Sequence, residues 1–149
     1  VRHDLPVEPV LRRTTRVLGA LGQRAMVATI ATGLPLSQAL GVGPVAGAVA
    51  AATGAGLALH ELGHALALGR RPGAIVLSGL RTFVLHAALP TRARRCVALA
   101  GPGLVAGAGL VVATCAGSVG SLPLAFGGCA WLSHALGLTV ITRDGRNAC

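Results

Sequence analysis

The sequence predicts an all-α membrane protein with about four transmembrane helices. Charged residues make up 11% of the 149-residue chain, about half of their usual share in soluble domains, and the mean hydropathy is +0.72. Glycine is abundant and aromatic residues reach only 2%, a composition typical of closely packed membrane helices. We expect one polytopic membrane domain at residues 25–149, after a basic cytoplasmic tail at residues 1–24 that leads into a short helix from Leu11.

The first two spans are expected at residues 25–40 and 44–68. The first segment is short, because a helix needs about 20 residues to cross the hydrocarbon core. A cleavable signal peptide is therefore the alternative to a retained first span. The second segment is long enough alone, and its small residues recur every four positions: Gly43, Gly47, Ala51 and Ala55. We expect this stripe to let another helix approach closely.

The segment at residues 74–89 differs from the expected spans in its residue pattern. Two short β-prone runs, 74–77 and 82–85, flank a Ser-Gly pair, and neither is long enough to span as a helix. We predict a β-hairpin or a re-entrant segment here, with an interfacial loop as the alternative. Two further spans are expected at about residues 96–116 and 122–141.

The basic residues predict the topology. All thirteen are arginines, and none lies in the turns expected near residues 41–44 and 117–121. Every arginine therefore falls on one side of a four-span bundle, which places both termini in the cytoplasm. We expect an integral, multi-pass protein in the lipid bilayer of a bacterial plasma membrane. Nucleic-acid binding is not expected, because apolar spans separate the arginine groups and no aromatic residues are interleaved with them.

The second span ends in the sequence His60-Glu61-Leu62-Gly63-His64. Two histidines four residues apart lie on one face of a helix, where both can ligate one metal ion. Glu61, next to the first histidine, is placed to act as a general base on a metal-bound water. A carboxylate inside a span costs about 2.5–3.5 kcal/mol at mid-helix depth and is therefore a functional hypothesis. The alternative is a structural Glu61 paired with an interfacial arginine such as Arg70.

A catalytic zinc site needs a third protein ligand beside His60 and His64. Asp144 follows the cytoplasmic end of the fourth span, at a depth similar to that of the two histidines, and is the predicted ligand. His86, in the 74–89 segment, is the alternative. His134 lies ten residues before Asp144 in the fourth span, which places it about 15 Å deeper in the membrane than Asp144 by helical rise. We therefore expect an interior hydrogen-bonded histidine there and not a ligand.

With these motifs the chain resembles the site-2 protease family of intramembrane zinc metalloproteases, over roughly residues 44–146. The resemblance rests on His60–His64 at the end of a span, Ala98–Gly103 opening the next, and Asp144-Gly145 after a further span. It implies that His60, His64 and Asp144 bind Zn²⁺, and that Glu61 is the catalytic base. It also implies hydrolysis of peptide bonds in membrane-spanning or membrane-associated protein substrates, which the 74–89 segment helps to receive.

The sequence departs from this family near Asp144. Leu136 and Thr139 occupy the places where the family commonly has Asn and Pro, and Arg146 replaces a glycine. These departures motivate a second hypothesis, a catalytically silent membrane protein of the same fold that binds a partner or a metal. A third hypothesis is a metal transporter or sensor that uses His60, His64 and His134.

Overall fold

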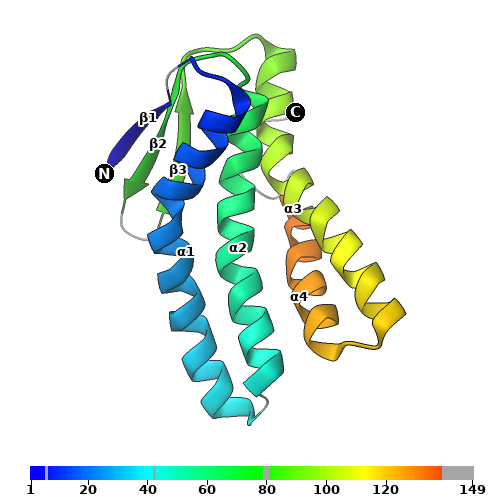
Figure 1. Cartoon of the computed structure of the whole chain (residues 1–149). Coiled ribbons are helices and arrows are strands. Elements are labelled where there is room, and N and C mark those ends of the chain that lie inside the picture. Colours follow the sequence, from blue (N-terminus) through cyan, green and yellow to red (C-terminus); the bar gives the residue numbers. More distant parts are fainter. Residues whose placement is uncertain (6, 42, 79–80, 139–149) are drawn as a thin grey trace.

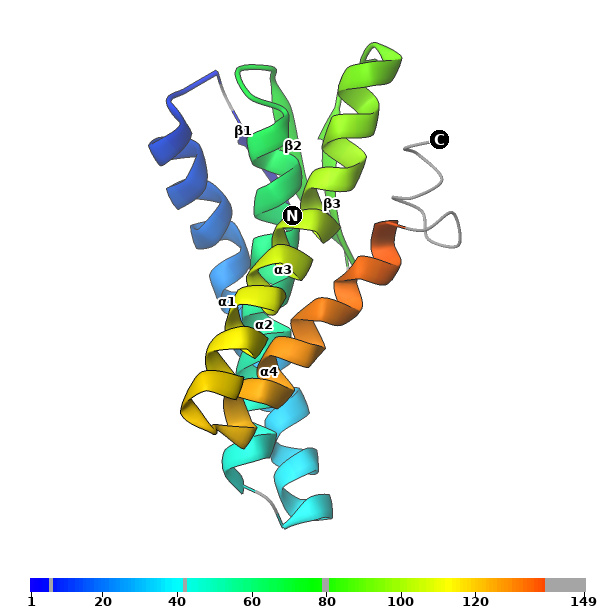
Figure 2. The same cartoon turned by 90° about the vertical axis from the view of Figure 1, so that its right-hand side faces the viewer.

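The computed structural model of the chain describes residues 1–5, 7–41, 43–78 and 81–138. Its elements follow in the order β1 (Arg2–Leu5), α1 (Val10–Leu40), α2 (Gly43–Ala67), β2 (Gly73–Ser78), β3 (Arg81–His86), α3 (Thr91–Val119), α4 (Leu122–Leu132) and the 3-10 helix η1 (Ser133–Leu138). Helix α2 lies in the middle, between α1 and the antiparallel pair of α3 and α4 (Figures 1 and 2). The chain is therefore mostly helical, with one small sheet.

Two helices are long and apolar enough to cross a membrane, Val45–Ala67 in α2 and Thr91–Val119 in α3. Helix α1 consists of two halves, Val10–Gly22 and Arg24–Ala39, which meet at a bend. If the two halves are counted together as one span, α1 is a third candidate membrane-spanning helix. The apolar helix Leu122–Leu136 is shorter than a span. Of the four expected spans, the second and third thus coincide with helices that are long and apolar enough to cross a membrane. The expectation of four spans is not confirmed, and the end of the fourth, residues 139–141, lies outside the described residues.

The predicted hairpin is confirmed, and a third strand joins it. Strands β2 and β3 pair antiparallel from Gly73 opposite His86 to Ser78 opposite Arg81. Strand β1 pairs antiparallel with the other edge of β2, giving the order β1-β2-β3. Local pattern does not predict β1, because only Leu5 of its four residues is buried and two of the others are charged.

Residues 1–24 therefore do not form a tail with a short helix. Leu5, Val17 and Leu21 belong to the buried apolar core, where they pack with residues of α2 and β2: Ala58, Leu62, Ala65, Ile75 and Leu77. The apolar area that these residues bury against α2 and β2 stabilises this arrangement. Helix α1 also continues beyond the bend to Leu40.

The predicted stripe of small residues is not the one that packs. Gly43, Gly47, Ala51 and Ala55 are exposed, and a Cβ at either glycine would meet no described atom within 4 Å. Helix α1 instead packs on a neighbouring row, where Ala46 and Ala50 are fully buried. A Cβ on Gly54, in the same row, would collide with the Thr29 hydroxyl. Small residues fill several rows of α2, so spacing alone does not identify the row that faces a partner.

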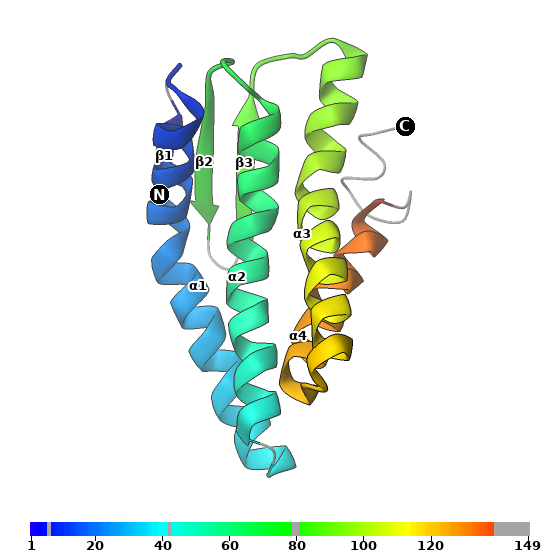
Figure 3. The ribbon, with the colours of Figure 1, turned by 45° about the vertical axis from the view of Figure 1, so that its right-hand side comes forward.

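The ends of the molecule differ in character (Figure 3). The α1–α2 and α3–α4 turns lie together at one end, where Gly41 and Gly120 adopt left-handed φ values of 61° and 63°. The sheet, the last turns of α2 and the first turns of α3 lie at the other end. The His60–His64 motif is therefore in the half of the molecule that carries the sheet and most of the arginines.

Candidate functional site

The two motif histidines face each other in the last two turns of α2. His60 Nε2 and His64 Nε2 are 3.1 Å apart, and the ring centroids are 4.8 Å apart in an edge-on arrangement. Two zinc ligands with bonds of about 2.0–2.1 Å and tetrahedral geometry have nitrogens roughly 3.4 Å apart. The pair therefore fits two positions of a zinc site with little adjustment.

A hydrogen bond from α3 fixes the orientation of His64. Its Nδ1 lies 2.6 Å from the backbone carbonyl oxygen of Val97. A carbonyl only accepts, so Nδ1 carries the proton and the Nε2 lone pair points toward His60. Metal-binding histidines commonly have such a partner on the other ring nitrogen, which fixes the tautomer. Val97 makes this contact through its backbone carbonyl, so no side-chain motif in the sequence predicts it.

Two glycines bring α3 close enough for this bond. A Cβ on Gly101 would collide with His64 Nε2, and a Cβ on Gly63 would collide with the carbonyl oxygen of Ala100. Both glycines are buried. The Ala98–Gly103 segment therefore has a local physical role, because its glycine lets the α3 backbone pass directly over the motif.

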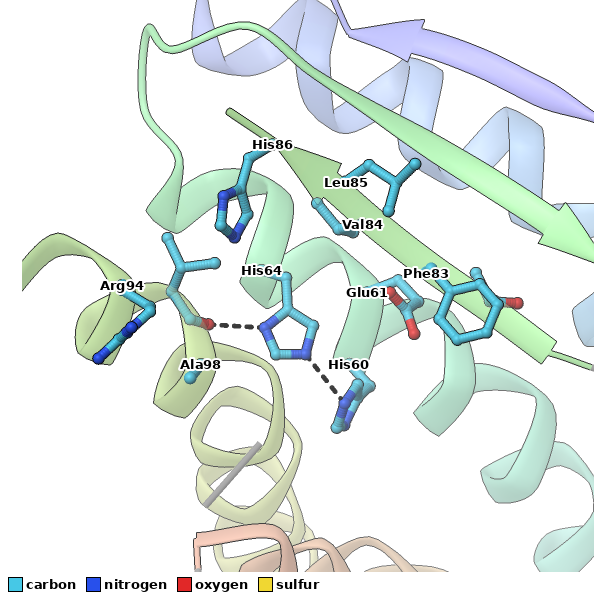
Figure 4. A pocket seen from close by; sticks show the side chains of 11 residues that line it. His60, Glu61, His64, Phe83, Val84, Leu85, His86, Arg94 and Ala98 are labelled. Atoms are coloured by element: carbon cyan, nitrogen blue, oxygen red, sulfur yellow. Dashed lines mark hydrogen bonds between the residues drawn. The ribbon is translucent and has the colours of Figure 1, made fainter. Parts of the chain in front are cut away.

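Glu61 lies beside the two histidines in a cavity of about 490 Å³ (Figure 4). Its side chain is nearly enclosed, since the residue is only 7% exposed. The cavity walls come from three elements: His60, Glu61 and His64 of α2, Thr82–His86 of β3, and Arg94, Val97 and Ala98 of α3. The carboxylate and the two imidazoles thus line one half-open cavity, with an edge of the sheet as its opposite wall.

Arg13 of α1 holds the end of the helix that carries the site. It is 1% exposed and donates hydrogen bonds to the carbonyl oxygens of Ala65, at 3.2 Å, and Arg71, at 3.0 Å. The last carbonyls of a helix have no partner inside it and carry partial negative charge, so a buried guanidinium there is favourable. Arg13 therefore does not belong to a basic tail, because it supports the end of the helix that carries the site.

His134 lies next to His60 and not at a distance from it. The Nδ1 atoms of the two rings are 3.3 Å apart. The expected depth was wrong because η1, which continues from α4 beside α3, brings the His134 ring up to His60. The expectation of a hydrogen-bonded interior histidine is confirmed, since His134 is half-buried and its ring nitrogen meets that of His60.

The third ligand stays a prediction. Asp144 lies outside the described residues. His86 is exposed at the rim of the cavity that holds Glu61, and its Nδ1 donates to the carbonyl oxygen of Ala87 at 2.8 Å. The described residues up to 138 contain no group of three or more His, Cys, Asp or Glu side chains that could hold a metal ion together. Within the described residues, His60 and His64 are thus the two candidate metal ligands, and Glu61 is the candidate base.

Comparison of the chain with protein-family models, with curated protein sequences and with solved structures finds no match.

Proposed function

We propose that the protein is an intramembrane zinc metalloprotease that cleaves membrane-spanning or membrane-associated proteins near the cytoplasmic face. One observation carries this proposal: two histidine Nε2 atoms 3.1 Å apart share a cavity with the buried carboxylate of Glu61. His60 and His64 would hold Zn²⁺, with Asp144 as the proposed third ligand. When bound, the ion supplies Lewis acidity and lowers the pKa of its water.

The residues of the chain supply the remaining steps. Glu61 takes the proton of the attacking water and passes it to the leaving amine, as a general base and then a general acid. Because Glu61 is only 7% exposed, its carboxylate has little contact with bulk water. His64, whose orientation Val97 fixes, keeps the site in one geometry through the reaction.

The sheet offers a means of receiving the substrate. Residues 82–86 of β3 line the cavity, and β3 is at the end of the strand order β1-β2-β3. A helical substrate must unwind, because its own hydrogen bonds shield the scissile carbonyl. An unwound segment can then add to the sheet as a further strand beside β3, the outer strand next to Glu61, by β-augmentation.

Exposed apolar side chains support the membrane setting. The candidate spans of α1 and α3 present large apolar residues to the surroundings, among them Met26, Ile30, Leu110 and Val111. Lipid would cover them, with the turns at Gly41 and Gly120 on the outer side. The arginine-rich end and both termini would then lie in the cytoplasm.

The first prediction concerns Glu61→Gln, which preserves the shape of the side chain and removes the base. Cleavage of a transmembrane reporter peptide in proteoliposomes should fall at least ~100-fold, because a positioned acid or base contributes about 10²–10⁴. Zinc per chain, measured by mass spectrometry of the metal, should not change.

The matched control is Asp4→Asn, which removes an exposed carboxylate of β1 and should leave cleavage unchanged. Retained activity in Glu61→Gln would overturn the assignment of the base. A folded wild-type chain that binds zinc but cleaves nothing would favour a catalytically silent, metal-binding member of the same fold.

A further inference from the structure

Three imidazoles form a continuous chain through the site. His134 Nδ1 is 3.3 Å from His60 Nδ1, and His60 Nε2 is 3.1 Å from His64 Nε2. The chain ends where His64 Nδ1 donates to the Val97 carbonyl oxygen. This fixed end allows the protons to be assigned one ring at a time.

In the neutral, metal-free chain each contact needs one donor. His64 carries its proton on Nδ1, so its Nε2 accepts and His60 Nε2–H donates. His60 Nδ1 then holds a lone pair and accepts from His134 Nδ1–H. All three contacts are satisfied with one proton on each ring.

Metal binding requires a different arrangement. A metal ion takes the Nε2 lone pairs of both His60 and His64, so the proton of His60 must lie on Nδ1. His60 Nδ1–H then donates to His134 Nδ1, and His134 carries its proton on Nε2. The hydrogen bond between His60 and His134 reverses while the number of protons stays the same.

We propose that His134 is a positioning residue for His60, and that the hydrogen bond between them reverses when the metal binds. This proposal rests on the proposed zinc site. An imidazole is suited to the position because it donates in one state and accepts in the other. A carboxylate or a backbone carbonyl would support only the metal-bound state, since neither donates.

The packing around His134 is built to hold it there. Trp131, one turn earlier, donates from Nε1 to the carbonyl oxygen of Ala52 at 2.6 Å. A Cβ on Gly56 would lie 3.3 Å from Trp131 Nε1 and 3.5 Å from His134 Nε2. Ala52, Gly56 and His60 are spaced four apart on one face of α2, so Trp131 and His134 dock on the row that leads to the metal ligand.

The experiment compares His134→Leu, which fills the space but makes no hydrogen bond, with His134→Asn, whose amide both donates and accepts. Zinc affinity is measured by chelator competition in detergent. We expect a 10–100-fold loss in His134→Leu, the usual effect of removing a partner of a metal-binding histidine. His134→Asn should recover most of the affinity, and the exposed His3→Ala should match the wild type.

Cobalt spectra separate a positioning role from ligation. The visible absorption of the Co²⁺-loaded protein should keep its shape in His134→Leu, because the ligands do not change. A spectrum showing a changed ligand set would overturn the proposal and make His134 a ligand. Unchanged zinc affinity in a folded His134→Leu variant would also overturn it.

Nitrogen-15 NMR of the wild-type imidazoles tests the proposal without any variant. We expect His60 to carry its proton on Nε2 without metal and on Nδ1 with zinc, and His134 to change from Nδ1 to Nε2. A metal-free protein whose His134 lacks a proton on Nδ1 would contradict the proposal. If the chain binds no zinc, the proposed function fails. The metal-free spectrum still tests, independently of zinc, whether His134 donates from Nδ1 to His60.

Discussion

His64 depends on the absence of a side chain at Gly101. The methyl group of an alanine there would overlap His64 Nε2 and approach the carbonyl oxygen of His60. Neither neighbour is free to move, because Val97 fixes the His64 ring and the carbonyl belongs to helix α2. A single carbon atom at this position is therefore expected to disturb both packing and metal binding.

We predict that Gly101→Ala lowers the free energy of unfolding by about 1–3 kcal/mol, the usual cost of overpacking. It should also weaken zinc binding, because α3 must move away from His64. Thermal unfolding in detergent and chelator competition measure the two effects. Gly103→Ala is the matched control, because a Cβ there meets no described atom within 4 Å and helix propensity favours alanine by about 1 kcal/mol. Equal behaviour of the two variants would contradict the proposed contact.

At the scale of elements, the site is held by the ends of helices that are distant in sequence. Arg13 of α1 caps the last turn of α2, and the start of α3 supplies the Val97 carbonyl to His64. The sheet closes the cavity from the remaining side. Contacts from α1 and α3 thus hold the end of α2 in place, so a rigid site is expected at the end of a helix that would otherwise fray.

Arg13→Met tests the cap while preserving much of the buried volume. Loss of the donors to Ala65 and Arg71 leaves carbonyl oxygens unsatisfied, which costs about 1–3 kcal/mol for a buried group. Hydrogen exchange should therefore become faster at the backbone amides of the last turn of α2. Arg12→Met, at an exposed neighbouring position, should leave exchange unchanged. Protection that is equal in both variants would show that the cap does not stabilise this turn.

The whole molecule has two unlike ends, and the membrane proposal depends on that polarity. The helix turns at one end contain no charged residue, whereas the sheet end gathers most of the arginines. The proposed cytoplasmic site and the proposed outer turns should therefore be separated by the bilayer. A test of sidedness also tests the number of spans, because an odd number of spans between two positions reverses their exposure.

We predict opposite labelling of Ala88→Cys and Val119→Cys, both exposed, in a chain whose four cysteines are replaced by alanine. A membrane-impermeant maleimide should label Ala88→Cys only from the cytoplasmic side and Val119→Cys only from the outer side. Ala88 lies just before α3 and Val119 is its last residue, and α3 is one of the two described helices long and apolar enough to span. Labelling of both from one side would exclude α3 as a span.

The sequence by itself determined what depends on local spacing. Helical periodicity placed His60 and His64 on one face beside Glu61, apolar length marked the helices of α2 and α3, and short β-prone runs marked the β2–β3 hairpin. These features need only the chain within about one turn or one strand of each residue. They can therefore be predicted without knowing how the helices and the sheet pack together.

Tertiary structure alone decided which groups meet across helices. The Val97 carbonyl and His134 reach the motif histidines, and Arg13 reaches Ala65 directly after the motif, across 33 to 74 residues of sequence. The row of small residues that packs, and the strand β1, also depend on neighbours absent from the local pattern. The physical reason is that helix rotation and crossing are set by the fit of whole surfaces, so no spacing within one helix encodes them.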